Sequence, residues 1–185
     1  MALLSGQRVI IASHNPGKVR EMRAILAPFK LKLVAAEEME LEEPTEDGDT
    51  FAANAKIKAT SASRSTGLTA IADDSGLEID ILGKLPGIYS SRWAGHKLDF
   101  KLAIKKVYNE LKKKNVNWNK KIRCRFICAL TVFWPNKKYY QAQGIVEGII
   151  SNKPKCYNGF GYDPIFIPKG YKTTFGQMLF SKKYK

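Results

Sequence analysis

The stretch Leu68-Thr-Ala-Ile-Ala-Asp-Asp-Ser-Gly-Leu77 decides the expected fold, because a short apolar run stops there at two adjacent carboxylates. Four to eight apolar and β-prone residues bounded by turn formers predict a buried strand, with Asp73-Asp-Ser-Gly76 as the turn. In α/β proteins ligands bind in the crevice at the carboxyl ends of strands. Two buried neighbouring aspartates repel each other, so a divalent metal, a lysine or a shared proton would relieve the cost. The same four residues are also typical of an ordinary turn.

A strand, a loop and a helix are expected near the start of the chain. Residues 8–12 form a β-branched run that ends at Ser13-His-Asn-Pro-Gly-Lys18, and apolar residues then recur at helical spacing. Pro16 suits the first helical turn, where its missing N–H would be unpaired anyway. Free backbone N–H groups, the helix dipole and Lys18 favour a phosphate site, although the Walker A spacing is absent. An ordinary strand-to-helix connection is the alternative.

A second short strand and a second helix follow. Residues 32–35 favour a strand, and the acidic stretch after it contains carboxylates that are candidate metal ligands or a solvated loop. Asp49 or Thr50 can cap a helix over about 51–63. On that helix Asn54 and Lys58 share one face. Lys58 is long enough to reach a phosphate, and an exposed surface lysine is the alternative.

The second half of the chain predicts further strands and one helix. Residues 77–82 alternate as a strand does, a helix begins at Leu98, and residues 112–121 look like an exposed loop. Two strands are expected near 123–134 and 138–149, joined by a hairpin turn.

Composition bounds the class of protein. With 185 residues and 44% hydrophobic content, the chain is long enough for one sizeable core, so a single domain over 1–185 is expected. There is no stretch of about 18 apolar residues and no signal-peptide pattern, so the protein is expected in the cytoplasm, away from membranes. Three cysteines without a C-x-x-C pair do not predict disulfides or a zinc site, and Cys124 and Cys128 are expected in the core.

The charge is placed unevenly along the chain. Residues 101–185 carry 19 Lys or Arg against 3 Asp or Glu, a net charge of +16, whereas residues 1–100 carry 12 against 14. Such a field attracts polyanions such as nucleotides or nucleic acid. A lysine-rich composition without selection for binding is the alternative, and no specific nucleic-acid partner is expected.

A glycine-rich loop lies near the end of the chain. In Asn158-Gly-Phe-Gly-Tyr-Asp-Pro164 two glycines flank an aromatic residue, and an aspartate precedes a proline. Such a loop can present a ring for stacking and an acceptor for a ligand N–H. A tight turn fits the same residues equally well.

Taken together, these motifs resemble the inosine triphosphate pyrophosphatase family, the non-canonical purine nucleoside triphosphate pyrophosphatases. Besides the loops at Ser13-His-Asn-Pro-Gly-Lys18 and at 158–164, the resemblance rests on three segments, and the five motifs together span nearly the whole chain. The three segments are Gly48-Asp-Thr-Phe-Ala-Ala-Asn-Ala-Lys-Ile-Lys-Ala59, Ile71-Ala-Asp-Asp-Ser-Gly-Leu77 and Leu85-Pro-Gly-Ile-Tyr-Ser-Ser-Arg92.

The resemblance implies an α/β fold with a central mixed β-sheet, flanking helices and two lobes around a nucleotide-binding cleft, usually in a homodimer. It implies hydrolysis of ITP, dITP and XTP to the monophosphate and pyrophosphate with Mg²⁺. Asp74 would activate water. Glu46, Asp74 and Asp73 would serve the metal. The implied substrate-binding residues are Ser13, His14, Asn15, Lys18, Lys58, Ser75, Phe160, Gly161, Tyr162, Asp163 and Lys185.

The sequence departs from the family pattern at two places. The family continues with a Ser-His-Arg segment and a closing helix, whereas this chain stops at Lys185. We therefore expect weaker base selectivity or an inactive remnant, since lost polar contacts of about 0.5–3 kcal/mol each weaken discrimination. Ala53 replaces an acid found in many members. A dead nucleotide- or nucleic-acid-binding protein and a septum-inhibitor-like pyrophosphatase are the competing hypotheses.

Overall fold

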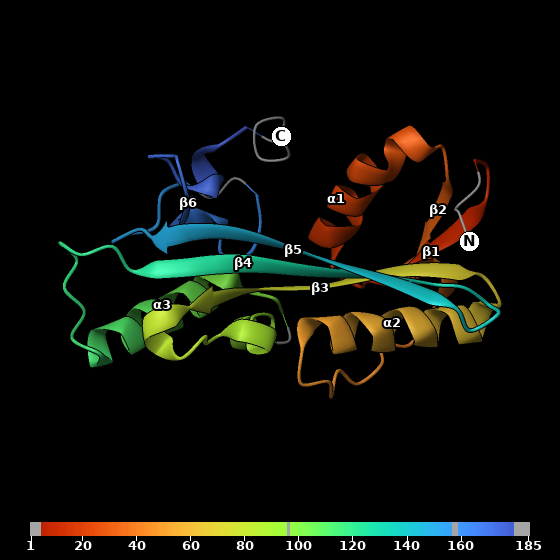
Figure 1. Cartoon of the computed structure of the whole chain (residues 1–185), viewed down its shortest axis with the longest axis horizontal. Helices are drawn as coiled ribbons and strands as arrows, with labels where there is room; N and C mark the ends of the chain where they lie inside the picture. The colour runs from red at the N-terminus through yellow and green to blue at the C-terminus, as the bar shows by residue number, and fades with distance from the viewer. Residues whose placement is uncertain (1–4, 96, 157–158, 180–185) are drawn as a thin grey trace. The chain divides into compact units, whose positions relative to one another are not determined.

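The computed structural model describes residues 5–95, 97–156 and 159–179 (Figure 1). Its described part contains a mixed sheet of six strands in the order β2-β1-β3-β4-β5-β6, with helices α1, α2 and α3 beside it. The expected α/β class with a central mixed sheet and flanking helices is therefore confirmed. The bounds are β1 Arg8–Ile11, α1 Pro16–Leu26, β2 Lys32–Ala35, α2 Phe51–Thr66, β3 Thr69–Ile79, α3 Phe100–Lys113, β4 Arg123–Phe133, β5 Tyr139–Ile150 and β6 Phe166–Pro168.

The chain divides into two compact units. Unit 1 comprises Met1–Asp74 and Cys128–Gln143, and unit 2 comprises Ser75–Ile127 and Gly144–Lys185. The expectation of one nucleotide pyrophosphatase domain over 1–185, with a cleft between two lobes, stays a prediction.

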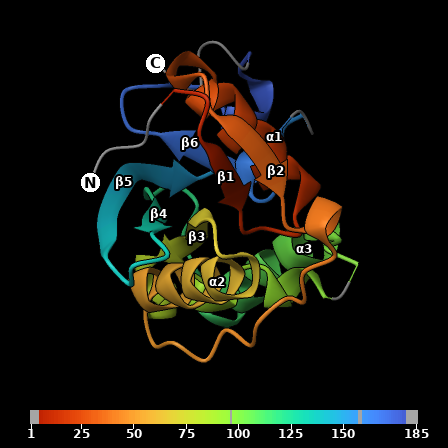
Figure 2. The same cartoon turned by 90° about the vertical axis from the view of Figure 1, so that its right-hand side faces the viewer.

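In unit 1 the sheet is covered on both faces. Strand β1 pairs in parallel with β2 and with β3, and its alternate residues face two different cores. Val9 and Ile11 pack with Met22 of α1, whereas Ile10 packs with Ala59 of α2. Figure 2 shows α1 and α2 on opposite sides of these strands. Burial on both faces explains why residues 9–12 are continuously apolar instead of alternating, whereas Arg8 at the start of β1 is exposed.

Unit 2 has one core built around α3. The helix buries Ala103, Ile104, Val107 and Leu111, which recur at helical spacing and pack together with Phe166 of β6. Asp99 caps the helix, because its side chain accepts a hydrogen bond from the Lys101 backbone N–H at 3.0 Å. The helix therefore begins at Phe100, and the prediction that it begins at Leu98 is wrong.

Strand β3 corrects the prediction made for the central stretch. Asp73-Asp-Ser-Gly76 is not a turn: β3 runs through it to Ile79, and a 3-10 turn at Asp80–Leu82 replaces the rest of the strand expected over 77–82. Both carboxylates lie inside the strand and are buried. Extended backbone is possible there because cations of the same unit compensate the carboxylates, as described below.

Strand β4 corrects the prediction for one cysteine. Cys124 is buried as expected, but Cys128 is exposed. The face of the strand that is buried changes along its length. Cys124 is buried near the start, at an even-numbered position, whereas further on the odd-numbered positions Ile127, Ala129 and Phe133 are buried. Cys128 lies between the buried residues Ile127 and Ala129, so its side chain is on the exposed face of the strand.

None of the helices in residues 5–95, 97–156 and 159–179 combines the length and the apolar character that a membrane span requires.

Candidate active site

The loop between β1 and α1 is closed by its own side chains. Asn15 caps α1: its Oδ1 accepts hydrogen bonds from the backbone N–H groups of Gly17 at 2.9 Å and Lys18 at 3.4 Å. The Asn15 N–H in turn donates to Ser13 Oγ at 3.2 Å. Pro16 occupies the first helical turn as predicted. The prediction of free N–H groups is wrong for Gly17 and Lys18, because Asn15 already satisfies both.

Helix α2 has a buried polar face that carries Asn54 and Lys58. Thr50 caps the helix and accepts from the Ala53 N–H at 3.1 Å, while Asn54 and Lys58, one turn apart, are both buried. The alternative of an exposed surface lysine at position 58 is therefore wrong. A long, charged side chain is rarely buried unless it is paired.

Two lysines and three carboxylates form a charged cluster in unit 1, which we call the charged cluster below. Lys18 Nζ lies 2.8 Å from Asp73 Oδ2. Lys58 Nζ lies 2.7 Å from Glu46 Oε1 and 3.6 Å from Asp74 Oδ1. Two positive and three negative charges leave a formal charge of −1 in a site with little access to water. Such a cluster is suited to a ligand that brings both a cation and an anion.

Asn54 completes the cluster and is a residue that the sequence analysis did not assign to the site. Its Nδ2 donates to Asp74 Oδ2 at 3.2 Å, and its Oδ1 accepts from the Gly48 N–H at 2.9 Å. A Cβ at residue 48 would lie 2.6 Å from Asn54 Oδ1, so the close approach requires glycine. The available signal was the four-residue spacing between Asn54 and Lys58 on one helical face.

The electrostatics keep Lys18 charged and make Asp74 a stronger base. Burial by itself would lower the pKa of Lys18, but Asp73 and Asp74 outweigh it and raise the pKa above 10.5. Burial raises the pKa of Asp74 above 3.8, and the Glu46 carboxylate adds to the rise. Lys58 and Lys18 oppose that rise without cancelling it.

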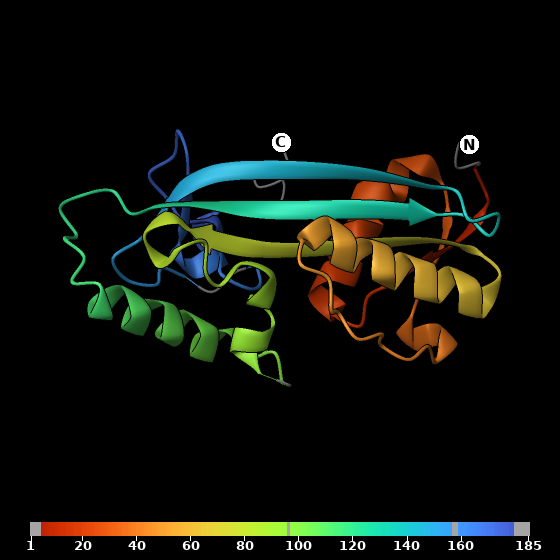
Figure 3. The ribbon, with the colours of Figure 1, turned by 60° about the horizontal axis from the view of Figure 1, so that its bottom comes forward.

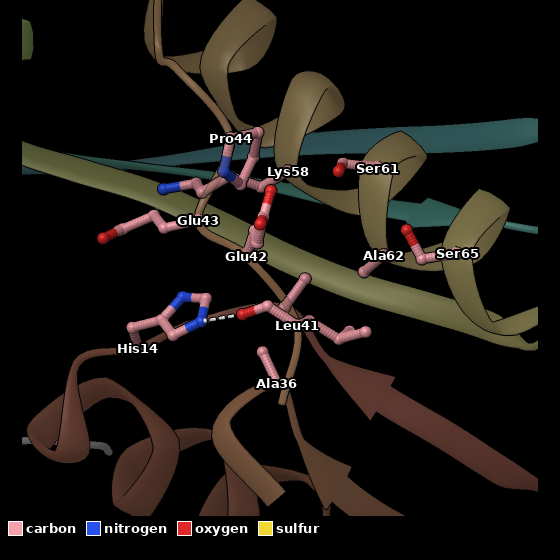
Figure 4. A pocket seen from close by; sticks show the side chains of 11 residues that line it. His14, Ala36, Leu41, Glu42, Glu43, Pro44, Lys58, Ser61, Ala62 and Ser65 are labelled. Atoms are coloured by element: carbon pink, nitrogen blue, oxygen red, sulfur yellow. Dashed lines mark hydrogen bonds between the residues drawn. The ribbon is translucent and has the colours of Figure 1, made fainter. Parts of the chain in front are cut away.

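His14 lies beside the cluster at a small cavity (Figure 4). Its Nε2 is 2.7 Å from the Leu41 carbonyl oxygen, and a carbonyl can only accept, so this nitrogen carries the hydrogen. The cavity holds about 20 Å³, room for roughly one water molecule, and Glu42 and Lys58 also line it. His14 is thus held in place by the loop that carries the acidic residues.

The glycine-rich loop of unit 2 is tied to its own unit. Asp163 is buried and accepts from the Phe160 N–H at 3.1 Å, and a Cβ at Gly159 would collide with its carboxylate. The Tyr162 hydroxyl donates to the Ser90 carbonyl oxygen at 2.9 Å, and burial raises the pKa of Tyr162. Phe160 and Gly161 are half-buried. Both the turn and the open-ring hypothesis therefore remain compatible with this loop.

The structure thus groups the predicted site residues by unit. In unit 1 it brings Asp73 and Asp74 together with Lys18, Lys58 and Glu46, with Ser13, His14 and Asn15 in the adjoining loop. Ser75 follows on β3, half-buried, and is assigned to unit 2 together with residues 160–163. Lys185 lies outside the described residues.

Carboxylate oxygens are the ligands that the charged cluster offers to a metal. Across residues 5–95, 97–156 and 159–179, no group of three or more His, Cys, Asp or Glu side chains is arranged to hold a metal ion. Glu46 and Asp74 nevertheless both approach the single Nζ of Lys58. Hard oxygen donors of this kind are those that Mg²⁺ prefers, so the donor chemistry fits that ion.

The fold and the charged cluster define an α/β protein with a buried centre of lysine and carboxylate side chains. Residues 9–185 match the model of the Ham1 family, so the chain belongs to that family.

Relatives and solved structures agree with this assignment. The chain is 46% identical over 171 residues to a dITP/XTP pyrophosphatase of Zymomonas mobilis, covering 92% of this chain and 81% of the relative. It is 44% identical to one of Bradyrhizobium sp., covering 98% and 84%. Among solved structures, a HAM1 protein of Coxiella burnetii has a TM-score of 0.84 at 34% identity, covering 96% and 89%. The Staphylococcus aureus Ham1 protein has a TM-score of 0.80 at 33% identity, covering 97% and 90%.

Proposed function

We propose that this chain hydrolyses non-canonical purine nucleoside triphosphates, namely ITP, dITP and XTP, to the monophosphate and pyrophosphate. The observation that supports this most directly is the charged cluster, in which Lys18 and Lys58 are held by Asp73, Asp74 and Glu46. Relatives at 40–46% identity that are named dITP/XTP pyrophosphatases support the same reaction.

The first role of the cluster is to bind the triphosphate. Lys18, in the first turn of α1, and Lys58, on α2, contact the neighbouring carboxylates Asp73 and Asp74. An incoming triphosphate offers them negative oxygens in place of the carboxylates that they contact now. Ser13, His14 and Asn15 are the neighbouring residues that we assign to the phosphates. The Ser13 hydroxyl and the Asn15 side-chain NH₂ can donate to them, whereas the Nε2–H of His14 already donates to the Leu41 carbonyl oxygen.

The second role is to activate water. Attack of water on the α-phosphorus forms a new P–O bond and breaks the bond to the bridging oxygen, which leaves with the pyrophosphate. The water must lose a proton, and we assign its acceptance to Asp74. The raised pKa of Asp74 makes this carboxylate a stronger base than an exposed one. Asn54 holds the other oxygen of the same carboxylate and so orients it.

The third role is to hold Mg²⁺, for which we assign Glu46 and Asp74 with Asp73 as their neighbour. When bound there, Mg²⁺ supplies positive charge to the phosphate oxygens. Lys58 Nζ contacts both Glu46 and Asp74 and so offsets the repulsion between their negative charges.

We assign binding of the purine to residues of unit 2, where Phe160 would stack on the base. Ser75, Gly161, Tyr162, Asp163 and Lys185 complete this part of the proposal. The Tyr162 hydroxyl and the Asp163 carboxylate already make hydrogen bonds within unit 2, which supports a role in shaping the loop around Phe160. We further propose that the enzyme acts in the cytoplasm as a homodimer.

The test is pyrophosphate release from ITP, XTP, dITP, GTP and ATP with Mg²⁺, comparing the wild type with Asp74→Asn. We expect turnover to favour ITP, dITP and XTP, and to fall by about 10²–10⁴-fold in the variant, the range of a general base. Asp47→Asn is the matched control, because Asp47 is exposed on the same acidic stretch. Turnover that is equal in Asp74→Asn and the wild type would refute the role of Asp74. No turnover by the wild type would refute the proposed activity.

A further inference from the structure

A groove in unit 2 shares no residue with the charged cluster of unit 1 and has no role in the reaction proposed above. It has a volume of about 510 Å³ and is lined by Tyr108, Lys112, Asn115, Val116, Trp118 and Asn152. Most of these residues lie at the end of α3 or on the loop that leads from α3 to β4 (Figure 3). We call it the Trp118 groove.

Two aromatic rings form the apolar part of the groove. Trp118 is 41% exposed, so its ring is accessible to a ligand. Its ring centroid lies 5.9 Å from that of Tyr108 at an angle of 44°. The Tyr108 hydroxyl donates to the Ser151 carbonyl oxygen at 2.9 Å and so fixes that ring. Indole and phenol faces of this kind accept a flat partner by stacking.

The loop that carries Trp118 is held by its own backbone. The Val116 N–H donates to the Leu111 carbonyl oxygen at 3.4 Å, and the Lys120 N–H donates to that of Asn117 at 3.0 Å. Asn117 also accepts from the Asn119 N–H through its side chain at 2.9 Å. The exposed tryptophan is therefore presented by an ordered turn, which lowers the entropic cost of binding a ligand there.

The charge around the groove is of one sign. Residues 112–121 contain five lysines and no Asp or Glu, and all five lysines are exposed. Within the part of the chain that the structure describes, only Lys113 among them has a carboxylate within 4.0 Å, that of Glu110 at 2.7 Å. The other four lysines, next to the exposed Trp118 ring, attract a ligand that has both phosphates and flat bases.

We propose that the Trp118 groove binds single-stranded nucleic acid without sequence preference. One unpaired base stacks on Trp118, and the side-chain amides of Asn115 and Asn152 can bond its edge. Lys112, Lys114 and Lys120 bind successive backbone phosphates. A duplex keeps its bases stacked inside and offers no free face, and a mononucleotide has too few phosphates to use the whole lysine run.

The main experiment measures fluorescence anisotropy of a labelled 12-nucleotide oligo(dT), and of oligo(U) as the RNA arm, with the wild-type chain. Trp118→Ala removes the stacking surface, and we expect affinity to fall by about tenfold. Trp118→Phe keeps a ring and should stay within roughly threefold of the wild type. Tyr171→Ala is the matched control, because Tyr171 is another exposed aromatic residue of unit 2.

A second measurement tests the phosphate contacts. Lys120→Ala should weaken binding and lower the slope of log affinity against log salt by about 0.7, the value for one phosphate contact with a single strand. Lys84→Ala removes an equally exposed lysine outside the groove and should leave the slope unchanged. Thermal unfolding of each variant confirms that it is folded, and the proposal does not depend on hydrolysis of any nucleotide.

Four outcomes would overturn the proposal. They are no binding of either oligonucleotide by the wild type, equal affinity in Trp118→Ala, equal affinity for a duplex of the same length, and displacement of the oligonucleotide by thymidine monophosphate at equal nucleotide concentration. Displacement by ITP that is lost in Lys58→Ala would instead place the oligonucleotide in the charged cluster, which also contradicts a separate groove.

Discussion

Asp74 shows how a single residue is set by its surroundings. The same carboxylate is held by Lys58 at 3.6 Å and by Asn54 at 3.2 Å, yet burial still raises its pKa. An isolated aspartate in a turn would be ionised with no cost. Buried in β3, it depends on both neighbours, and their removal would leave a charge without compensation.

The pH dependence of stability follows from that shift. A carboxyl group with a raised pKa binds its proton more tightly in the folded than in the unfolded chain. Its contribution to stability is therefore largest at low pH and falls as the pH rises above 3.8, the ordinary value, through the higher folded pKa.

We expect the free energy of unfolding of the wild type, relative to Asp74→Asn, to decrease over that window and then to become constant. Urea unfolding from pH 3.5 to pH 8 measures it, with Asp47→Asn as the control. A difference that increases with pH would mean that Asp74 is stabilised as a carboxylate, contrary to the expected sign.

At the level of elements, the helices begin where their caps are. Asn15 precedes α1, Thr50 precedes α2 and Asp99 precedes α3, and each accepts a backbone N–H of the first turn. The cap of α2 matters for the site, because Asn54 and Lys58 lie on the first two turns of that helix. If the first turn of α2 unfolded, the side chains of Asn54 and Lys58 would move relative to Asp74.

Thr50→Ala tests this connection. Loss of the bond to the Ala53 N–H should cost about 1 kcal/mol of the free energy of unfolding, within a range of about 0.5–2. Thr45→Ala, on the exposed acidic stretch, is the control and should cost less than about 0.5 kcal/mol. Chemical denaturation gives both values. Equal losses in the two variants would show that the cap contributes nothing specific.

Most elements were predictable from local patterns. The strands expected at 8–12, 123–134 and 138–149 and the helix expected at 51–63 agree with β1, β4, β5 and α2 within a few residues. Periodicity and caps determine such segments. The two ends of β3 were also predicted, but its continuity through Asp73 to Gly76 was not, because those four residues have the composition of a turn. Lys18 and Lys58, from other elements, compensate the carboxylates that this continuity buries.

At the level of the whole molecule, the charges are distributed according to the two tasks that we propose. The balanced first 100 residues contain the charged cluster, in which both signs meet, whereas the basic residues 101–185 contain the Trp118 groove. A ligand that binds only the folded chain stabilises it by mass action, so the two sites can be distinguished by unfolding.

We therefore expect Mg²⁺ with a non-hydrolysable ITP analogue to raise the thermal midpoint of the wild type. At 100 times the dissociation constant the gain corresponds to about 2.7 kcal/mol. Lys58→Ala should lose most of this rise, and Trp118→Ala should keep it. Differential scanning fluorimetry over a range of analogue concentrations is the measurement. A rise in the thermal midpoint that is lost in Trp118→Ala and kept in Lys58→Ala would show that the nucleotide binds in the Trp118 groove and not in the charged cluster.

The order of the motifs by itself determined the family and the mixed α/β class, and it predicted the residues of a nucleotide site, since apolar periodicity and motif spacing are properties of the chain. Only the tertiary structure decided that Lys58 is buried, that Asn54 holds Asp74, that Cys128 is exposed, and that Trp118 lies beside Tyr108. Each of these depends on which side chains from distant positions meet, because burial and charge compensation arise from neighbours in space.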